Sequence, residues 1–380
     1  MPSCHLCLAG DVRELPEYAR LTRVTSDCKP WPAGGRLGVC SRCGGVQKVV
    51  DAQWEEEIAR IYSDYTIYFQ AGGAEQAVFL GDLAQPMTRS EWLVQQVIRQ
   101  AALPASGRLL DIGCGNGAFL GAFSGIMPDW TLAGTELSDA MRAIVERIPR
   151  VEALYTGALE EIPGHFDVIS LVHVLEHISR PLELLAAVSK KLAPGGTVFV
   201  QVPDAARNPF DLLIADHVSH FTRDTARALL ESAGYSVFEA EQSWVVKEIS
   251  MLATYGGVLT PRDPLPDVRD ASRALDWLLS ARAGAIAARV GATGPFGLFG
   301  SSIAATWLAH EVDCGIEFFV DEDPGRHGHR FMGRLVVGPN DVPPASVVYV
   351  GIGGGVGEQV ARRLSRDVPS VRWISAPPLH

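Results

Sequence analysis

The sequence has few charged side chains and no long apolar run. Charged residues make up 20% of the 380 residues and hydrophobic residues 47%, a balance that excludes a disordered or fibrous chain. No stretch approaches the roughly 18 consecutive apolar residues of a membrane helix, and the first residues lack the basic and apolar regions of a signal peptide. We therefore expect a cytoplasmic protein with no membrane partner, and its length predicts two or three domains.

Positive charge is also scarce. The chain has 33 Lys and Arg against 44 Asp and Glu, which gives a formal net charge of -11. A nucleic-acid partner requires a basic surface, so this balance disfavours nucleic acid, although a local arginine cluster could still hold a small anion. The composition leaves the oligomeric state open.

Cysteine is rare along most of the chain, yet five of the seven lie within the first 43 residues. Cys4 and Cys7 form one C-x2-C pair, and Cys40 and Cys43 form another, which predicts a closed tetrahedral Zn²⁺ site that supports folding. The alternative is two accidental pairs in a loop region. Cys28 has no paired cysteine. We expect it to be a buried packing residue, and the alternative is that it replaces one of the four metal ligands.

Further along, helical patterns alternate with short β-branched runs, which is typical of βαβ units around a parallel sheet. We expect a zinc-binding module (1–60), a central α/β domain (61–255) that starts with an aromatic linker (61–85), and a smaller C-terminal α/β domain (256–380). The expected helices are 91–102, 140–147, 181–192, 224–233 and 268–290. The expected strands are 108–112, 131–135, 168–172, 197–202, 296–300, 316–320, 347–351 and 371–375.

An apolar strand runs into a glycine-rich turn at Asp111-Ile112-Gly113-Cys114-Gly115-Asn116-Gly117. Such a turn lets the backbone approach a nucleotide at the carboxyl edge of a sheet, and Glu136 ends the next strand, where it can accept both ribose hydroxyls. Carboxylates beside the loop repel a pyrophosphate but suit a sulfonium or amino group. This favours S-adenosylmethionine over NAD, with an NAD-binding or empty Rossmann unit as the alternative.

These motifs, together with FDVI at 166–169, VLEH at 174–177 and LAPGG at 192–196, resemble the successive motifs of class I S-adenosylmethionine-dependent methyltransferases. The resemblance implies a Rossmann-like central domain. It places Asp111, Gly113 and Gly115 at the methionine side of the cofactor and Glu136 at its ribose. It also implies that the adenine contacts Leu137, Ala158 and Leu159, and that the transferred methyl group lies beside Val172 and His173.

The order of zinc module, aromatic linker, methyltransferase domain and degenerate Rossmann-like domain is similar to that of the nucleotide-sugar C-methyltransferases, which act on dTDP-linked keto-deoxysugars. That resemblance implies a histidine base in the segment Asp216-His217-Val218-Ser219-His220, with Asp216 orienting or tuning His217. Removal of a proton beside a ketone needs such a base. An exposed helix-capping segment is the alternative reading.

The same resemblance implies that His177 contacts the sugar or enolate and that Tyr68, with Tyr65, covers the sugar; a packing role for the tyrosines is equally compatible with the sequence. Asp216 stands where the family has Glu, and Ile214 where a Tyr is expected. The acceptor atom therefore stays open. O- or N-methylation of another small metabolite, or a non-catalytic zinc- and nucleotide-binding module, are the alternatives. The turn at Gly300 could also mark an independent NAD site.

Overall fold

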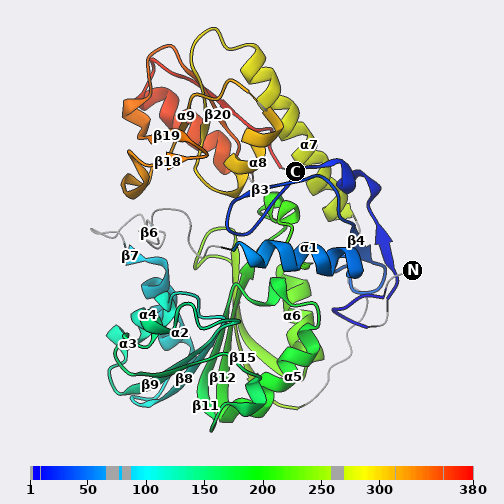
Figure 1. Ribbon diagram of the computed structural model, residues 1–380, viewed down its shortest axis with the longest axis vertical. Coiled ribbons are helices and arrows are strands. Elements are labelled where there is room, and N and C mark those ends of the chain that lie inside the picture. Colours follow the sequence, from blue (N-terminus) through cyan, green and yellow to red (C-terminus); the bar gives the residue numbers. More distant parts are fainter. Residues whose placement is uncertain are drawn as a thin grey trace.

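The computed structural model describes residues 3–8, 10–65, 77–78, 87–257, 269–312, 314–353 and 355–379. Sheets of four, seven and six strands organise these residues, with two short two-stranded pairs beside them. Figure 1 shows the seven-stranded and six-stranded sheets at opposite ends of the molecule, and helix α1 (Ala52–Ser63) crossing between them. The chain thus has a mixed α/β fold with a large central sheet.

The seven-stranded sheet has the order β10-β9-β8-β11-β12-β15-β14. The first five strands are parallel, and β15 is antiparallel to β12 and β14. Its strands are β8 (Gly107–Ile112), β9 (Trp130–Thr135), β10 (Val151–Tyr155), β11 (Phe166–Val172), β12 (Leu192–Pro203), β14 (Tyr235–Glu241) and β15 (Glu248–Tyr255). Its helices are α2 (Arg89–Ala101), α3 (Ala118–Ile126), α4 (Arg142–Val145), α5 (Pro181–Lys191) and α6 (Arg223–Ser232).

The chain changes direction across this sheet at β8, which pairs with β9 on one side and β11 on the other. Open α/β sheets bind ligands at the carboxyl ends of the strands beside such a switch point. The turns that follow β8, β9 and β11 all lie at this edge, so it is where the structure gathers candidate site residues.

The N-terminal segment forms a sheet that it does not complete by itself. Strands β1 (Val12–Glu14), β4 (Leu37–Cys40) and β5 (Val46–Lys48) are joined by β13 (Ser219–His220), which comes from the middle of the chain. Strands β2 (Arg23–Val24) and β3 (Pro30–Trp31) form a separate pair. The N-terminal module is therefore tied to the segment that carries His217.

The third unit is a six-stranded sheet with the order β18-β19-β17-β16-β20-β21. Its strands are parallel except for β18, which is antiparallel to β19. Its elements are α7 (Arg269–Val290), β16 (Phe296–Phe299), α8 (Ile303–Val312), β17 (Phe318–Val320), β18 (Arg330–Phe331), β19 (Arg334–Val337), β20 (Val347–Val350), α9 (Val356–Asp367) and β21 (Arg372–Ser375).

Apolar side chains of the N-terminal module belong to two different cores. Tyr18 and Leu21 pack in one cluster with Trp277 and Trp307 of the C-terminal unit, and Trp307 Nε1 donates to the Thr22 carbonyl at 3.0 Å. Another cluster joins Leu6, Val12 and Cys40 to the central sheet. Burial of these side chains on both sides fixes the module between the two α/β units.

The strands expected from the β-branched runs are all present, with bounds within a few residues except at the start of β12. In the two large sheets, five strands were not predicted, namely β10, β14, β15, β18 and β19, and the expected helix at 140–147 is only the short α4. Most of the expected aromatic linker lies outside the described residues, apart from the start at 61–65, β6 (Ala77–Val78) and the adjoining β7 (Met87–Thr88). Among the described helices, none combines the length and apolarity needed to cross a membrane.

Candidate functional site

The glycine-rich turn after β8 has backbone geometry that requires glycine. Gly113 and Gly115 have φ angles of 65° and 57°. A Cβ atom on Gly113 would lie 2.8 Å from Cγ2 of Val174, so the turn packs closely against the segment that follows β11. Because glycine has no side chain, the backbone N–H groups of the turn are not covered by Cβ atoms, which allows a ligand to approach them closely.

Two carboxylates flank this turn, as expected from the sequence. Glu136 accepts hydrogen bonds from the backbone N–H groups of Gly115, at 2.6 Å, and Leu137, at 3.0 Å. Asp111 is buried and accepts from Ser170 Oγ at 2.7 Å. Burial, aided by the charge of Glu136, raises the pKa of Asp111 to about 7. A positively charged ligand group at this edge would favour the ionised form of Asp111.

The surroundings of the turn fit a nucleoside with a cationic tail. Leu137 is 83% exposed directly after Glu136, and Ala158 is exposed beside half-buried Leu159. An apolar surface, a ribose acceptor and a carboxylate-lined backbone turn thus lie along one sheet edge, which matches the chemistry of S-adenosylmethionine.

His173 follows half-buried Val172 at the end of β11, and ion pairs hold it in place. Its Nδ1 lies 2.9 Å from Glu176 Oε1, and its Nε2 lies 3.2 Å from Glu248 Oε1. Burial alone would lower the pKa of His173, but the charges of Glu248 and Glu176 outweigh this and raise it to about 9. Because His173 is protonated at neutral pH, it can orient this loop but has no free lone pair to act as a base.

His217 and His177 meet at the end of the sheet next to the N-terminal module. Their ring centroids are 4.6 Å apart and their planes are nearly perpendicular, at 87°. The His217 segment is held from both sides, since the Val218 N–H donates to the Glu176 carbonyl and the Lys48 N–H donates to the Val218 carbonyl. Sequence reasoning named both histidines, and the structure brings them together.

The carboxylate that contacts His217 is Asp211, a correction to the expectation that Asp216 orients it. His217 Nδ1 lies 2.7 Å from Asp211 Oδ1, and His220 Nδ1 lies 2.7 Å from Asp211 Oδ2. Burial alone would lower the pKa of His217, but the charge and hydrogen bond of Asp211 raise it above its ordinary value. Asp211 was missed; the only signal was an acid within the apolar run Pro209-Phe210-Asp211-Leu212-Leu213.

Asp216 instead connects the site to the N-terminal module and to His177. Its carboxylate accepts from the Ser26 N–H at 2.8 Å and from Ser26 Oγ at 2.5 Å. Its Oδ2 atom lies 3.5 Å from His177 Nδ1, and its backbone carbonyl lies 3.1 Å from the same nitrogen. Asp216 therefore positions His177 directly, and it influences His217 only through its charge.

A tyrosine does reach this pair, but it is Tyr62 at the end of α1. Its hydroxyl lies 3.1 Å from His177 Nδ1, and its ring makes an edge contact with that of Tyr65. The Tyr65 hydroxyl lies 3.1 Å from Ser26 Oγ. Tyr68, named from the sequence as a site residue, lies outside the described residues. Tyr62, which begins the same aromatic segment of the sequence, was not named as a site residue.

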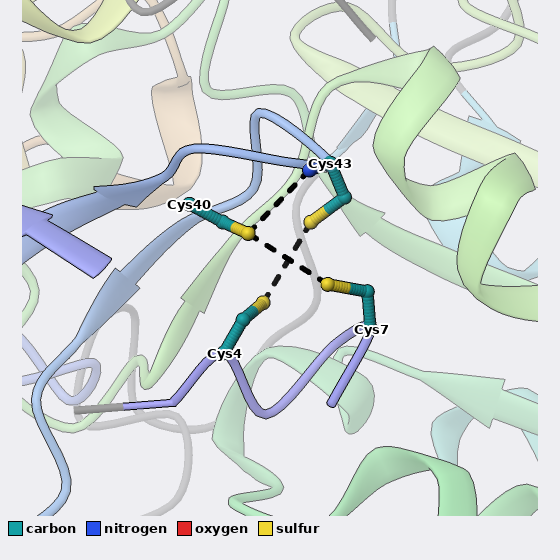
Figure 2. A group of neighbouring side chains, drawn as sticks. All are labelled: Cys4, Cys7, Cys40 and Cys43. Atoms are coloured by element: carbon teal, nitrogen blue, oxygen red, sulfur yellow. Dashed lines mark hydrogen bonds between the residues drawn. The ribbon is translucent and has the colours of Figure 1, made fainter. Parts of the chain in front are cut away.

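The four cysteines of the two C-x2-C pairs converge on one point. Figure 2 shows their sulfur atoms facing inward from two turns, with 3.6 Å between Sγ of Cys4 and Cys43 and 3.7 Å between Sγ of Cys7 and Cys40. Four thiolates around Zn²⁺ at Zn–S distances of about 2.3 Å would be spaced by about 3.8 Å, so the donor set fits that ion. A Cβ atom on Gly10 would lie 2.4 Å from Cys40 Sγ, so glycine is needed there.

Cys28 is not part of this group. Its carbonyl accepts a hydrogen bond from Thr306 Oγ1 on α8 at 3.3 Å, and burial raises the pKa of its thiol to about 12. The cysteine cluster found among the described residues contains Cys4, Cys7, Cys40 and Cys43 without it. Cys28 therefore packs between the N-terminal module and the C-terminal unit.

Known proteins resemble the central part of this chain. Residues 88–240 match the model of a family described as a methyltransferase domain. The ubiquinone biosynthesis O-methyltransferases of Xanthomonas campestris pv. campestris (strain B100) and Pseudomonas aeruginosa (strain LESB58) are each 30% identical, over 125 and 123 residues. These alignments cover 31% and 29% of this chain and 52% and 50% of the relatives, so the chain spans about half the length of the curated relatives it matches.

Solved structures show a similar but more distant likeness. A methyltransferase from Clostridium acetobutylicum ATCC 824 has a TM-score of 0.37 and 14% identity, with 44% of this chain and 91% of that chain covered. Human N-acetylserotonin methyltransferase in complex with S-adenosylmethionine has a TM-score of 0.36 and 18% identity, with 44% and 51% covered. From the family match and the curated relatives, we conclude that residues 88–240 form a methyltransferase domain.

Proposed function

We propose that the protein transfers a methyl group from S-adenosylmethionine to the carbon beside the 4-keto group of a nucleotide-linked sugar, with His217 as the base. The observation that carries this proposal is the hydrogen bond between His217 Nδ1 and Asp211. An ionised carboxylate only accepts hydrogen bonds, so Nδ1 must carry the proton. Nε2 of a neutral His217 then holds a lone pair that can accept a proton from the substrate.

The environment of His217 suits the removal of a proton from carbon. His217 is 4% exposed, so water competes little for Nε2. The raised pKa makes this imidazole a stronger base than an unperturbed histidine, and efficient proton transfer requires a base with a pKa near the working pH. As Nε2 takes the proton, the C–H electron pair would move into an enolate whose carbon bonds to the methyl group, while the methyl–sulfur bond breaks and its electron pair leaves with S-adenosylhomocysteine.

The neighbours of His217 could stabilise the charge that develops on the enolate oxygen. Burial and the charge of His217 lower the pKa of His177, so this second imidazole is protonated less readily than an ordinary histidine. Asp216 and Tyr62 fix the His177 ring through Nδ1. We assign to His177, and to Tyr68 from the linker, contacts with the sugar or its enolate oxygen.

The cofactor supplies an electrophilic methyl group on a sulfonium, and residues of the sheet edge would hold it. In this proposal Asp111, Gly113 and Gly115 bind the methionine portion, and Glu136 exchanges its backbone hydrogen bonds for the ribose hydroxyls. The remaining contacts come from the exposed apolar residues and from the loop after β11. They are Leu137, Ala158 and Leu159 at adenine, with Val172 and His173 near the methyl group.

The zinc ion belongs to the same proposal as a structural component. Cys4, Cys7, Cys40 and Cys43 would hold Zn²⁺ with all four positions filled, leaving none for a substrate. The nucleotide part of the acceptor would use the C-terminal unit, because a second parallel sheet ends there in glycine-rich turns such as Gly300 and Gly351. The His217 segment lies where these parts meet.

O-methylation of a small metabolite is the second candidate, and the names of the curated relatives favour it. Their alignments cover about a third of this chain. The site also includes Ser26 of the N-terminal module and Tyr62 of α1. In this alternative His217 would remove a proton from a hydroxyl group, with no exchange at carbon.

Proton exchange distinguishes the two candidates. We expect wild-type protein, incubated in deuterated water with dTDP-4-keto-6-deoxyglucose and no methyl donor, to introduce deuterium beside the ketone, and His217→Ala to lose this exchange. His165→Ala is the matched control. His165 is exposed and precedes β11, so it lies at the opposite end of that strand from His173 and His177. Calorimetry should show unchanged S-adenosylmethionine affinity in both variants. Exchange at the wild-type rate in His217→Ala would remove His217 from the mechanism.

A further inference from the structure

A buried lysine of the N-terminal sheet lies at the far end of the hydrogen-bonded chain that begins at His217. Lys48, the last residue of β5, is 2% exposed. Its Nζ atom lies 2.5 Å from the Leu212 carbonyl, 3.0 Å from His220 Nε2, and 4.3 Å from the centroid of the Tyr18 ring. Fully buried lysines are rare, so these partners require an explanation.

The proton positions along this chain follow from donor and acceptor chemistry. Asp211 accepts at both oxygens, so His217 and His220 both donate from Nδ1. Nε2 of a neutral His220 then has a lone pair, and Lys48 Nζ, which has N–H groups to give, donates to it. A hydrogen-bonded network therefore connects Lys48 to His220 and His220 to one oxygen of Asp211, and the other oxygen of Asp211 accepts from His217.

We propose that Lys48 is a positioning residue for methyl transfer: by donating to His220 Nε2 it keeps His220 neutral, so that the negative charge of Asp211 supports protonation of His217 alone. This inference rests on the proposed role of His217 as the base. It gives the N-terminal module a part in the chemistry, in addition to its part in folding.

Without Lys48, His220 would compete with His217 for the same carboxylate. Burial lowers the pKa of His220 to about 4, and Lys48 adds to this shift when it is charged, although burial also lowers the pKa of Lys48 itself. Removing the lysine frees Nε2 to take a proton, and a protonated His220 would repel a proton on His217 through the shared Asp211. The base would then be weaker.

We expect the other charged groups around this hydrogen-bonded network to stay in place when Lys48 is substituted. Glu176 and Asp216 raise the pKa of His217. Arg23, ion-paired with Glu57 in the N-terminal module, faces Lys48. Because these groups stay in place, a change in His217 after substitution of Lys48 reports on the path through His220. The titratable and charged groups that face the network of Lys48, His220, Asp211 and His217 are Arg23, Glu57, Glu176, His177 and Asp216.

The test is a double-mutant cycle on the pKa of His217, read by NMR of ¹⁵N-labelled histidine in the full-length, zinc-loaded protein. The resonance is assigned with His217→Gln. We expect Lys48→Met to lower the pKa of His217 by roughly one unit, equivalent to about a tenfold loss in proton affinity. In a His220→Phe background the same substitution should leave the His217 pKa unchanged, because the connecting group is gone.

Arg36→Met is the matched control, since Arg36 carries a cation on the same module but pairs with exposed Glu14 and Asp51 away from the chain. Zinc content and S-adenosylmethionine affinity should match wild type in every variant. The inference is overturned if Lys48→Met leaves the His217 pKa unchanged, or if the shift persists in the His220→Phe background. If Lys48→Met does not fold, Lys48→Arg takes its place, and the His217 pKa is again compared with and without His220→Phe.

This readout needs no substrate, so it is separate from the proposed function. A wild-type protein that shows no carbon exchange would refute C-methylation and leave the titration result standing. Where methyl transfer can be followed, Lys48→Met should move the acid limb of the kcat/KM profile to lower pH and reduce the plateau rate, whereas a purely structural role would lower the rate without moving the limb.

Discussion

Asp211→Asn is the substitution for which the structure predicts the largest effect outside the base itself. Asp211 is 1% exposed, and its two oxygens each accept an imidazole N–H at 2.7 Å. The amide removes the charge and can donate from its NH₂ group to His217 Nδ1. His217 would then adopt the tautomer with the proton on Nε2, where the lone pair is needed.

The magnitude follows from the hydrogen bond that is lost. A buried hydrogen bond to a charged group contributes about 1.5–3 kcal/mol. At 1.36 kcal/mol for each pKa unit, this predicts a decrease of roughly one to two units in the pKa of His217. The methylation rate should fall by about two to three orders of magnitude, within the range that a positioned base provides.

The assay is the pH dependence of kcat/KM. The base acts when it is deprotonated, so the wild-type rate should rise with pH through the raised pKa of His217, and in Asp211→Asn that rise should occur at lower pH. Asp216→Asn is the comparison, because Asp216 bonds to Ser26 and His177 rather than to His217. We expect it to lose less activity. A wild-type rate and acid limb in Asp211→Asn would refute this account of the base.

Three further predictions concern the cofactor, the metal and the pH dependence of stability. Glu136→Ala should weaken S-adenosylmethionine binding by about 1–3 kcal/mol, measured by calorimetry, because two ribose hydroxyls lose their acceptor. Cys40→Ser should lower both the zinc content, by elemental analysis, and the folding yield. The ion pairs of His173 raise its pKa to about 9, so their contribution to stability is complete below pH 6.5 and is lost as the pH rises through about 9; Glu248→Gln should flatten this dependence in urea unfolding.

Each of these three predictions would be contradicted by a specific result. Unchanged affinity in Glu136→Ala would place the ribose elsewhere. Full zinc content in Cys40→Ser, or none in wild type purified without chelators, would exclude the tetrahedral site. A wild-type pH dependence of unfolding in Glu248→Gln would remove the ion pair as its cause.

Local pattern explains what the sequence predicted well. Gly113, Gly115 and Glu136 lie together as expected, because a strand, a glycine turn and an acid at the next strand end occur at fixed spacing; their binding of the cofactor stays a prediction. Cys4 and Cys40 were found because each has a partner three residues away. In both cases the chemistry lies within short segments whose geometry is set by a turn.

Long-range packing explains what was missed. The contact between Asp211 and His217 depends on a short helical turn, Pro209–Leu213, that folds the acid back onto the loop. Lys48 reaches His220 only because β13 pairs with β5 across more than 170 residues of sequence. No periodicity or motif in the chain encodes these pairings, so they become visible only when the sheets are assembled.

The position of the transferred methyl group tests the central claim most directly. The protein would be incubated with S-adenosylmethionine carrying a ¹³C-labelled methyl group and with a dTDP-4-keto sugar labelled with ¹³C in its ring. We predict a product in which the methyl carbon shows one-bond coupling to the ring carbon beside the ketone. A product whose methyl carbon is joined to the ring through oxygen would contradict C-methylation by His217 and favour the O-methyltransferase alternative.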